Sequence, residues 1–151
     1  MPGNWQQRDL PNLTDTNCKL TSPATTRYNC IAWAAQEDQR WWWPDPLYQY
    51  YWPPPPVPRE VTMEAFVEAF QTLGYSICLD GSANENYDKI AIYGVTSPDG
   101  TVTPTHASFQ LPAGIWTSKL GKLEDIAHNG VDNVNGPVYG RPFIFMHRPR
   151  P

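Results

Sequence analysis

A cysteine and a histidine far apart in the sequence have the settings of a nucleophile and its base. Cys30 lies in the segment YNCIAWAA, where a helix is expected to begin, and His106 lies in the segment PTHA, where a strand is expected to begin. A thiolate is the reactive form of cysteine, and a helix N-terminus with a nearby imidazolium lowers the pKa of the thiol. If the two side chains meet, they predict a cysteine hydrolase or acyl transferase.

The local patterns predict how each residue is presented. Asn29 is a favourable N-cap for a helix over residues 29–39, which makes Cys30 the first helical residue. In a strand over residues 104–111, alternation puts His106, Ser108 and Gln110 on one face and Ala107 on the other. The histidine is therefore expected on the polar face of a half-buried strand, facing a cleft.

The remaining elements predict an α+β fold. Thr62 is expected to begin a second helix with an apolar face, and Gly74 is expected just after its end. Further strands are predicted over residues 75–79, 89–95, 115–118 and 138–146, with a short helix over 123–128. We expect a single small domain, 1–151, with an extended N-terminal segment, 1–27, and an N-terminal helix packed on an antiparallel sheet.

A Trp/Pro-rich loop interrupts these elements. The chain has seven tryptophans and seventeen prolines, and both concentrate in residues 41–58, where proline forbids a regular helix or a central strand. One interpretation is that the loop covers the core. The other is that its aromatic side chains line a groove for a peptide, a polyproline segment or a sugar. The candidate substrate-binding residues are Trp41, Trp42, Trp43, Trp52 and Trp116.

Composition excludes several classes of protein. The net charge is −4 and there is no basic run, which disfavours nucleic-acid binding. No apolar stretch approaches the roughly 20 residues that span a bilayer, and residues 1–10 lack the apolar core of a signal peptide. We therefore expect a cytoplasmic protein that is not membrane-bound, with signal-independent export left open. The three cysteines and three histidines show neither a disulfide framework nor a metal signature, so no metal or cofactor is predicted.

Several of these motifs together resemble known families. A cysteine at a helix start, then His106-Ala107 on one strand and Gly114-Ile115-Trp116 on the next, resembles the papain-like superfamily and, locally, transglutaminase-like domains. The resemblance implies a papain-like core. Over most of the chain the sequence also resembles an uncharacterised bacterial domain family through the motifs YNCIAWA, WWWP, KIAIY, PTHA and WTSKLG.

The resemblance to transglutaminases also implies a third catalytic residue. An aspartate is expected just after Trp116, but this sequence has Thr117, Ser118 and Lys119 there. Ser118 or Gln110 is therefore the candidate that orients the imidazole, since a Cys–His pair can work with a neutral partner.

The resulting hypothesis is attack of Cys30 on the amide or acyl carbonyl of a protein or peptide substrate, with His106 as base and then acid. Backbone amides with Asn17 or Asn29 would bind the oxyanion, and Asn17 is preferred if Asn29 is the N-cap. The alternative is a non-enzymatic binding or accessory domain with the Trp/Pro-rich loop as its surface. A third reading is an effector domain delivered into another cell.

Overall fold

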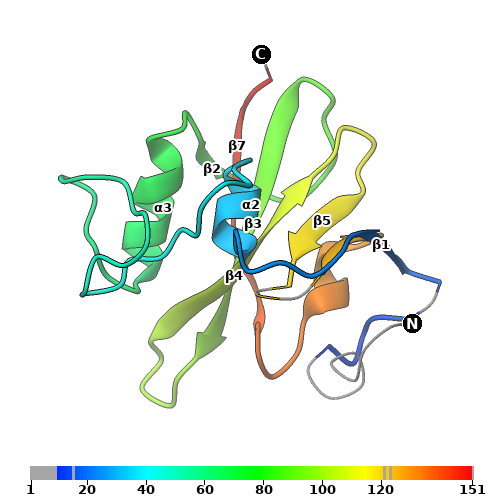
Figure 1. Ribbon diagram of the computed structural model, residues 1–151. Helices are drawn as coiled ribbons and strands as arrows, with labels where there is room; N and C mark the ends of the chain where they lie inside the picture. The colour runs from blue at the N-terminus through cyan, green and yellow to red at the C-terminus, as the bar shows by residue number, and fades with distance from the viewer. Residues whose placement is uncertain (1–9, 15, 121, 123, 151) are drawn as a thin grey trace.

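The fold is built on one antiparallel sheet of seven strands. The computed structural model describes residues 10–14, 16–120, 122 and 124–150. Within them the strand order is β1-β6-β5-β4-β3-β7-β2, and every neighbouring pair is antiparallel (Figure 1). The strands are β1 (Cys18–Ser22), β2 (Ser76–Cys78), β3 (Tyr87–Thr96), β4 (Val102–Gln110), β5 (Trp116–Lys119), β6 (Asp125–His128) and β7 (Arg141–Pro149).

Helix α3 (Met63–Gln71) follows the predicted signals closely. The Thr62 side chain caps it by accepting a hydrogen bond from the Ala65 amide, and Gly74 follows its end with a φ of +93°. Phe66 and Phe70 lie on its buried face. The N-cap, the spacing of the apolar residues and the left-handed glycine therefore all indicate the same helix.

Helix α2 (Cys30–Ala34) is shorter than predicted. Asn29 is its N-cap, but the helix ends at Ala34 rather than near residue 39. Gln36 takes a left-handed φ of +63°, its amide bonds to the Trp33 carbonyl, and the Glu37 amide bonds to the Ala32 carbonyl. This is a Schellman ending with glutamine in the place usually taken by glycine, so the sequence carried no obvious stop signal.

The prediction of a short helix over residues 123–128 was wrong in its described part. Residues 125–128 form β6, which pairs with β1 on one side and with β5 on the other. Strand pairing on both sides satisfies the backbone of this segment, and that outweighs its weak helical preference.

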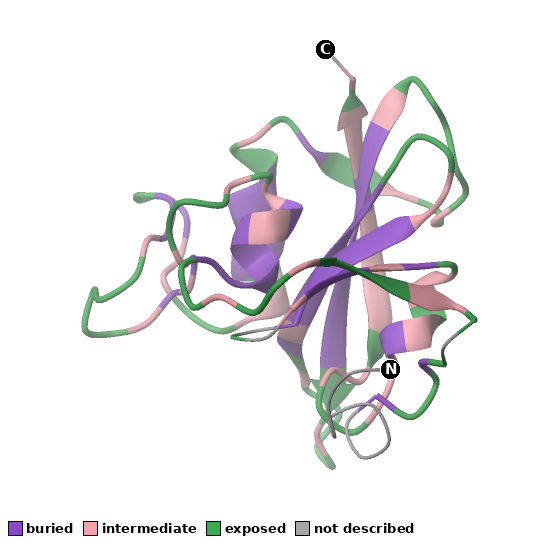
Figure 2. Ribbon diagram, turned by 45° about the vertical axis from the view of Figure 1, so that its right-hand side comes forward, coloured by how far each residue is buried: buried purple, intermediate pink, exposed green. Residues whose placement is uncertain are grey.

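Both faces of the sheet are covered, and each has its own core (Figure 2). The two α-helices and the Trp/Pro-rich loop pack on the face that carries Ile90, Ile92 and Ala107. The other face carries Ala91, Tyr93 and Trp116 and is covered by Leu10, Leu13 and the 3₁₀-helix η1 (Val131–Val134). The antiparallel sheet was predicted correctly, but the domain is mostly sheet and is only partly the expected helix-on-sheet arrangement.

None of the helices in the described parts of the chain has the length and apolar character that crossing a bilayer requires.

Gly140 closes the connection to β7 and tolerates no side chain. Its φ is +72°, and an added Cβ would lie 1.8 Å from the Gly94 carbonyl oxygen. We expect Gly140→Ala to lower the free energy of unfolding by about 3 kcal/mol or more, because β3 and β7 must separate.

Gly74→Ala is the matched control, because Gly74 has a similar φ but nothing within 4 Å of the added atom. It should cost only about 1 kcal/mol. Urea denaturation measures both, and equal losses would contradict a steric role for Gly140.

Candidate functional site

Cys30 is a core residue in this structure. It opens α2, is only 6% exposed, and packs with Ala107 and Phe109 of β4 on the helical face of the sheet. Burial raises the pKa of its thiol to about 11, although contact with the backbone of Ala107 and the charge of Lys119 partly oppose the shift. A buried thiol with a raised pKa is a poor nucleophile.

His106 lies on the opposite face of the same strand. It pairs with Tyr93 in the β3–β4 register and stacks on Tyr139 at 3.9 Å between ring centroids. Its neighbour Ala107 belongs to the core that contains Cys30. Because successive residues of a strand point to opposite faces, β4 itself separates the imidazole from the thiol. The structure does not form the predicted Cys30–His106 pair.

The structure does bring His106 and Ser118 together. The Nε2 atom of His106 is 3.0 Å from the Ser118 hydroxyl, which is also 2.8 Å from Nε2 of His128 and 2.7 Å from the Ser108 hydroxyl. His128 Nδ1 is 2.9 Å from the Gly130 carbonyl oxygen, so that nitrogen carries the proton and donates. Ser118 must then donate to His128 and accept from His106, while the single hydroxyl proton of Ser108 is shared between Ser118 and the Tyr93 hydroxyl, which lies 3.2 Å away.

Burial favours the neutral form of both imidazoles in this network. Burial, together with the charge of His128, lowers the pKa of His106 well below its usual value, and burial lowers the pKa of His128 to about 4. With Nε2 of His106 donating to Ser118, Nδ1 carries a lone pair and has no hydrogen-bond partner in the described structure. The network is a buried polar cluster in which one acceptor, Nδ1 of His106, has no partner among the described residues.

The other predicted members of the catalytic site lie elsewhere. Gln110 donates a hydrogen bond from its amide to the Gly81 carbonyl and does not contact His106. Asn17 bonds within the loop before β1, to the Thr14 amide and the Asn12 carbonyl. His128 was missed as a partner of Ser118 because residues 123–128 were predicted as a helix. The register of β5 with β6, which sets Trp116 opposite His128, is what brings the two together.

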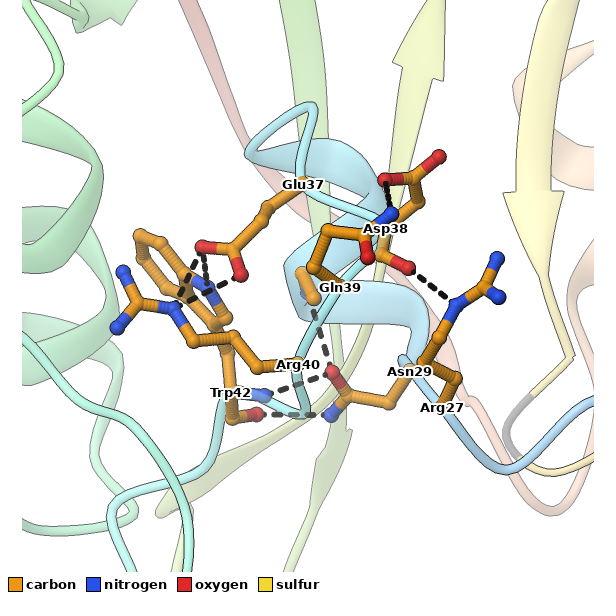
Figure 3. A network of polar contacts seen from close by, with 8 residues as sticks. Arg27, Asn29, Glu37, Asp38, Gln39, Arg40 and Trp42 are labelled. Atoms are coloured by element: carbon orange, nitrogen blue, oxygen red, sulfur yellow. Dashed lines mark hydrogen bonds and ion pairs between the residues drawn. The ribbon is translucent and has the colours of Figure 1, made fainter.

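Asn29 is the N-cap of α2 and also anchors the Trp/Pro-rich loop (Figure 3). Its Oδ1 accepts from the amides of Ala32 and Trp42, and its Nδ2 donates to the Trp42 carbonyl. Both polar atoms of the side chain are therefore engaged in structural hydrogen bonds. These bonds fix the start of the loop to the start of the helix.

The five predicted substrate-binding tryptophans divide into two groups. Trp42 and Trp52 are buried in the helical-face core and Trp116 in the opposite core, so these three hold the fold together. Trp41 and Trp43 are half-exposed. The interpretation of the loop as a cover for the core therefore describes most of its aromatic residues.

The first half of the loop nevertheless presents apolar side chains to solvent. We call this group the aromatic tip, and it consists of Trp41, Leu47, Tyr48 and Tyr50. Leu47 is 74% exposed and Tyr48 is 78% exposed. Trp41 and Tyr50 contact each other at 5.7 Å between ring centroids.

A partly buried ion pair between Arg59 and Asp45 fixes the conformation of the aromatic tip. Arg59 donates to the carbonyl and the carboxylate of Asp45 and to the Tyr50 carbonyl, and its guanidinium lies 4.3 Å from the centre of the Tyr48 ring. The Asp45 carboxylate in turn accepts from the amides of Gln49 and Tyr50. No pattern in the sequence indicates that Arg59 organises the loop.

Among the described residues, no group of three or more His, Cys, Asp or Glu side chains is placed to hold a metal ion.

The described residues form a small, sheet-dominated domain in which Cys30 and His106 lie on opposite faces of β4. Residues 19–147 match the family described as Domain of unknown function (DUF7689), and the chain belongs to that family. No curated protein and no solved structure matches the chain. Membership of an uncharacterised family is thus confirmed, and no comparison supports the resemblance to papain-like or transglutaminase-like families.

The buried histidines predict that stability falls in mild acid. Both have a lower pKa when folded than the value near 6.5 of an unfolded chain, so the unfolded state binds more protons below that pH. The free energy of unfolding should therefore be highest above pH 6.5 and should decrease toward pH 4. His128 alone accounts for about 3 kcal/mol of this loss.

Chemical denaturation between pH 7 and pH 4 measures the decrease, and His128→Gln should make the curve flatter. The raised pKa of Asp125, caused by its burial, acts in the opposite direction and reduces the loss at the acid end. A wild-type curve that is flat between pH 7 and pH 5 would contradict the assignment of two neutral imidazoles.

Proposed function

We propose that this domain is a non-catalytic binding module that recognises a segment of another protein through its aromatic tip. The observation that carries the proposal is that Leu47 and Tyr48 are strongly exposed while the backbone beneath them is tied by Arg59 and Asp45. Exposed apolar side chains that are grouped and held in place are typical of interaction sites.

The rigidity of the aromatic tip supports recognition rather than accidental exposure. Tyrosine and tryptophan offer large contact areas with few rotatable bonds, and a loop already fixed in shape loses little entropy on binding. The Tyr48 ring is further restrained by the guanidinium of Arg59, and its own φ is a positive 56°. A non-glycine residue with positive φ stays in place only when its surroundings hold it there.

The competing proposal is a cysteine hydrolase or acyl transferase that uses Cys30. It requires His106 to reach the other face of β4, or another base to reach a thiol that is almost completely buried. Lys119 contributes charge near Cys30, and its amine donates a hydrogen bond to the Thr25 carbonyl. The arrangement of the described residues therefore favours binding over catalysis.

The aromatic tip should be required for capture of a protein partner. We expect an immobilised wild-type domain to retain a specific protein from a lysate of its source cells, and Tyr48→Ser with Leu47→Ser to abolish that retention. The retained protein should then bind the purified wild-type domain in a calorimetric titration.

Leu79→Ser is the matched control, because Leu79 is 99% exposed but lies outside the aromatic tip. It should leave retention unchanged. Equal retention by the tip variant and the wild type would contradict the proposal.

Cys30 should be unreactive in the folded protein. A pKa of about 11 leaves roughly one thiolate in ten thousand at pH 7, and burial excludes the reagent. Alkylation with iodoacetamide, read site by site by mass spectrometry, should modify the partly exposed Cys18 and Cys78 first and Cys30 only on unfolding. His106→Ala should not alter this order. Fast modification of Cys30 that depends on His106 would establish the enzyme instead.

A further inference from the structure

We propose that a cleft between α2 and the β1–β6–β5 edge of the sheet binds a neutral saccharide of one or two rings. The cleft has a volume of about 580 Å³, within the range of small-molecule sites. It is lined by side chains from the segment 21–28, from the end of α2 and from β5 and β6. It lies apart from the aromatic tip, so this inference does not depend on the proposed function.

The inner wall of the cleft contains a buried carboxylate with one open acceptor. Asp125 is 3% exposed, and its Oδ2 accepts a short hydrogen bond from the Tyr28 hydroxyl. Its Oδ1 is buried and makes no hydrogen bond of normal geometry among the described residues, although the Ser22 hydroxyl lies near enough to the carboxyl to oppose the rise of its pKa. A buried acceptor without a donor is costly, and a ligand hydroxyl that reaches it would relieve that cost.

The charges around the cleft cancel. Arg27 and Asp38 stand at its rim, where Nε of Arg27 donates to the Asp38 carbonyl. Behind the wall, the amine of Lys119 lies near Asp125 and donates to the Thr25 carbonyl. Two cations and two carboxylates leave no net charge to attract an anion or a cation, so an uncharged ligand is the better match.

Hydroxyl groups, an indole and the apolar side chains of Pro23 and Leu111 complete the lining. Thr21, Ser22 and Thr25 contribute hydroxyls that both donate and accept. Trp33 borders the cleft and is half-exposed, and its indole N–H donates to Thr117 Oγ1 at 3.0 Å. That bond fixes the indole plane while leaving an apolar surface beside the polar groups.

This combination fits the chemistry of a sugar. A sugar ring has C–H surfaces that pack on an aromatic ring, and a rim of hydroxyls that bond to carboxylates, guanidinium groups and hydroxyls. A purely apolar ligand would leave Asp125 unsatisfied, and a charged ligand would lack a counter-charge. The geometry therefore selects a neutral ligand that carries several hydroxyls.

The test is a titration followed by ¹H–¹⁵N NMR with defined probes: glucose, galactose, N-acetylglucosamine, maltose, cellobiose and lactose. The indole N–H of Trp33, identified by its absence in Trp33→Phe, is the reporter together with the amide of Thr117. We expect at least one probe to shift both signals in a saturable way, and Asp125→Asn to weaken that binding about tenfold or more.

Two further variants keep the test decisive. Asp99→Asn makes the same chemical change in the exposed turn after β3 and should leave the dissociation constant unchanged. Arg27→Gln removes an exposed rim donor without touching the core and should weaken binding even if Asp125→Asn fails to fold. The proposal would be overturned if none of the sugars produced a saturable shift. It would also be overturned if only the charged control compounds arginine, glutamate or phosphate shifted the two signals.

Discussion

Strand β4 is covered on both faces, and this constraint decides what its side chains can do. A strand at the centre of an open sheet with one wet face could present a histidine to a cleft, but here the alternate residues of β4 enter two separate cores. Ala107 makes room for α2 on one side, while His106 and Ser108 join a polar network on the other. The chemistry available to Cys30 and His106 follows from which face each one occupies.

Local sequence signals were sufficient to predict features that depend only on residues within the same element. Asn29 and Thr62 cap the two helices as expected, and Gly74 ends α3 in the left-handed conformation. The alternation in β4 also placed His106, Ser108 and Gln110 on a common face correctly. These features depend on neighbours within a few residues, so a single sequence contains them.

What could not be predicted depends on packing between distant segments. No local pattern in residues 28–35 predicts on which face of β4 the helix packs. The face on which it packs separates Cys30 from His106. Gln36 takes a left-handed conformation that glycine usually adopts at this position, so its role as a helix stop is visible only in three dimensions. His128 likewise reaches Ser118 only through the pairing of β5 with β6.

The sheet order has a consequence for how the domain can associate. Its two edges are β1, which has five residues and an irregular register near Leu20 and Ser22, and β2, which has only three. Neither edge offers a long, regular row of free backbone groups, which protects the sheet from extension by strands of other chains. Addition of a strand at these two edges of the described sheet is thereby disfavoured.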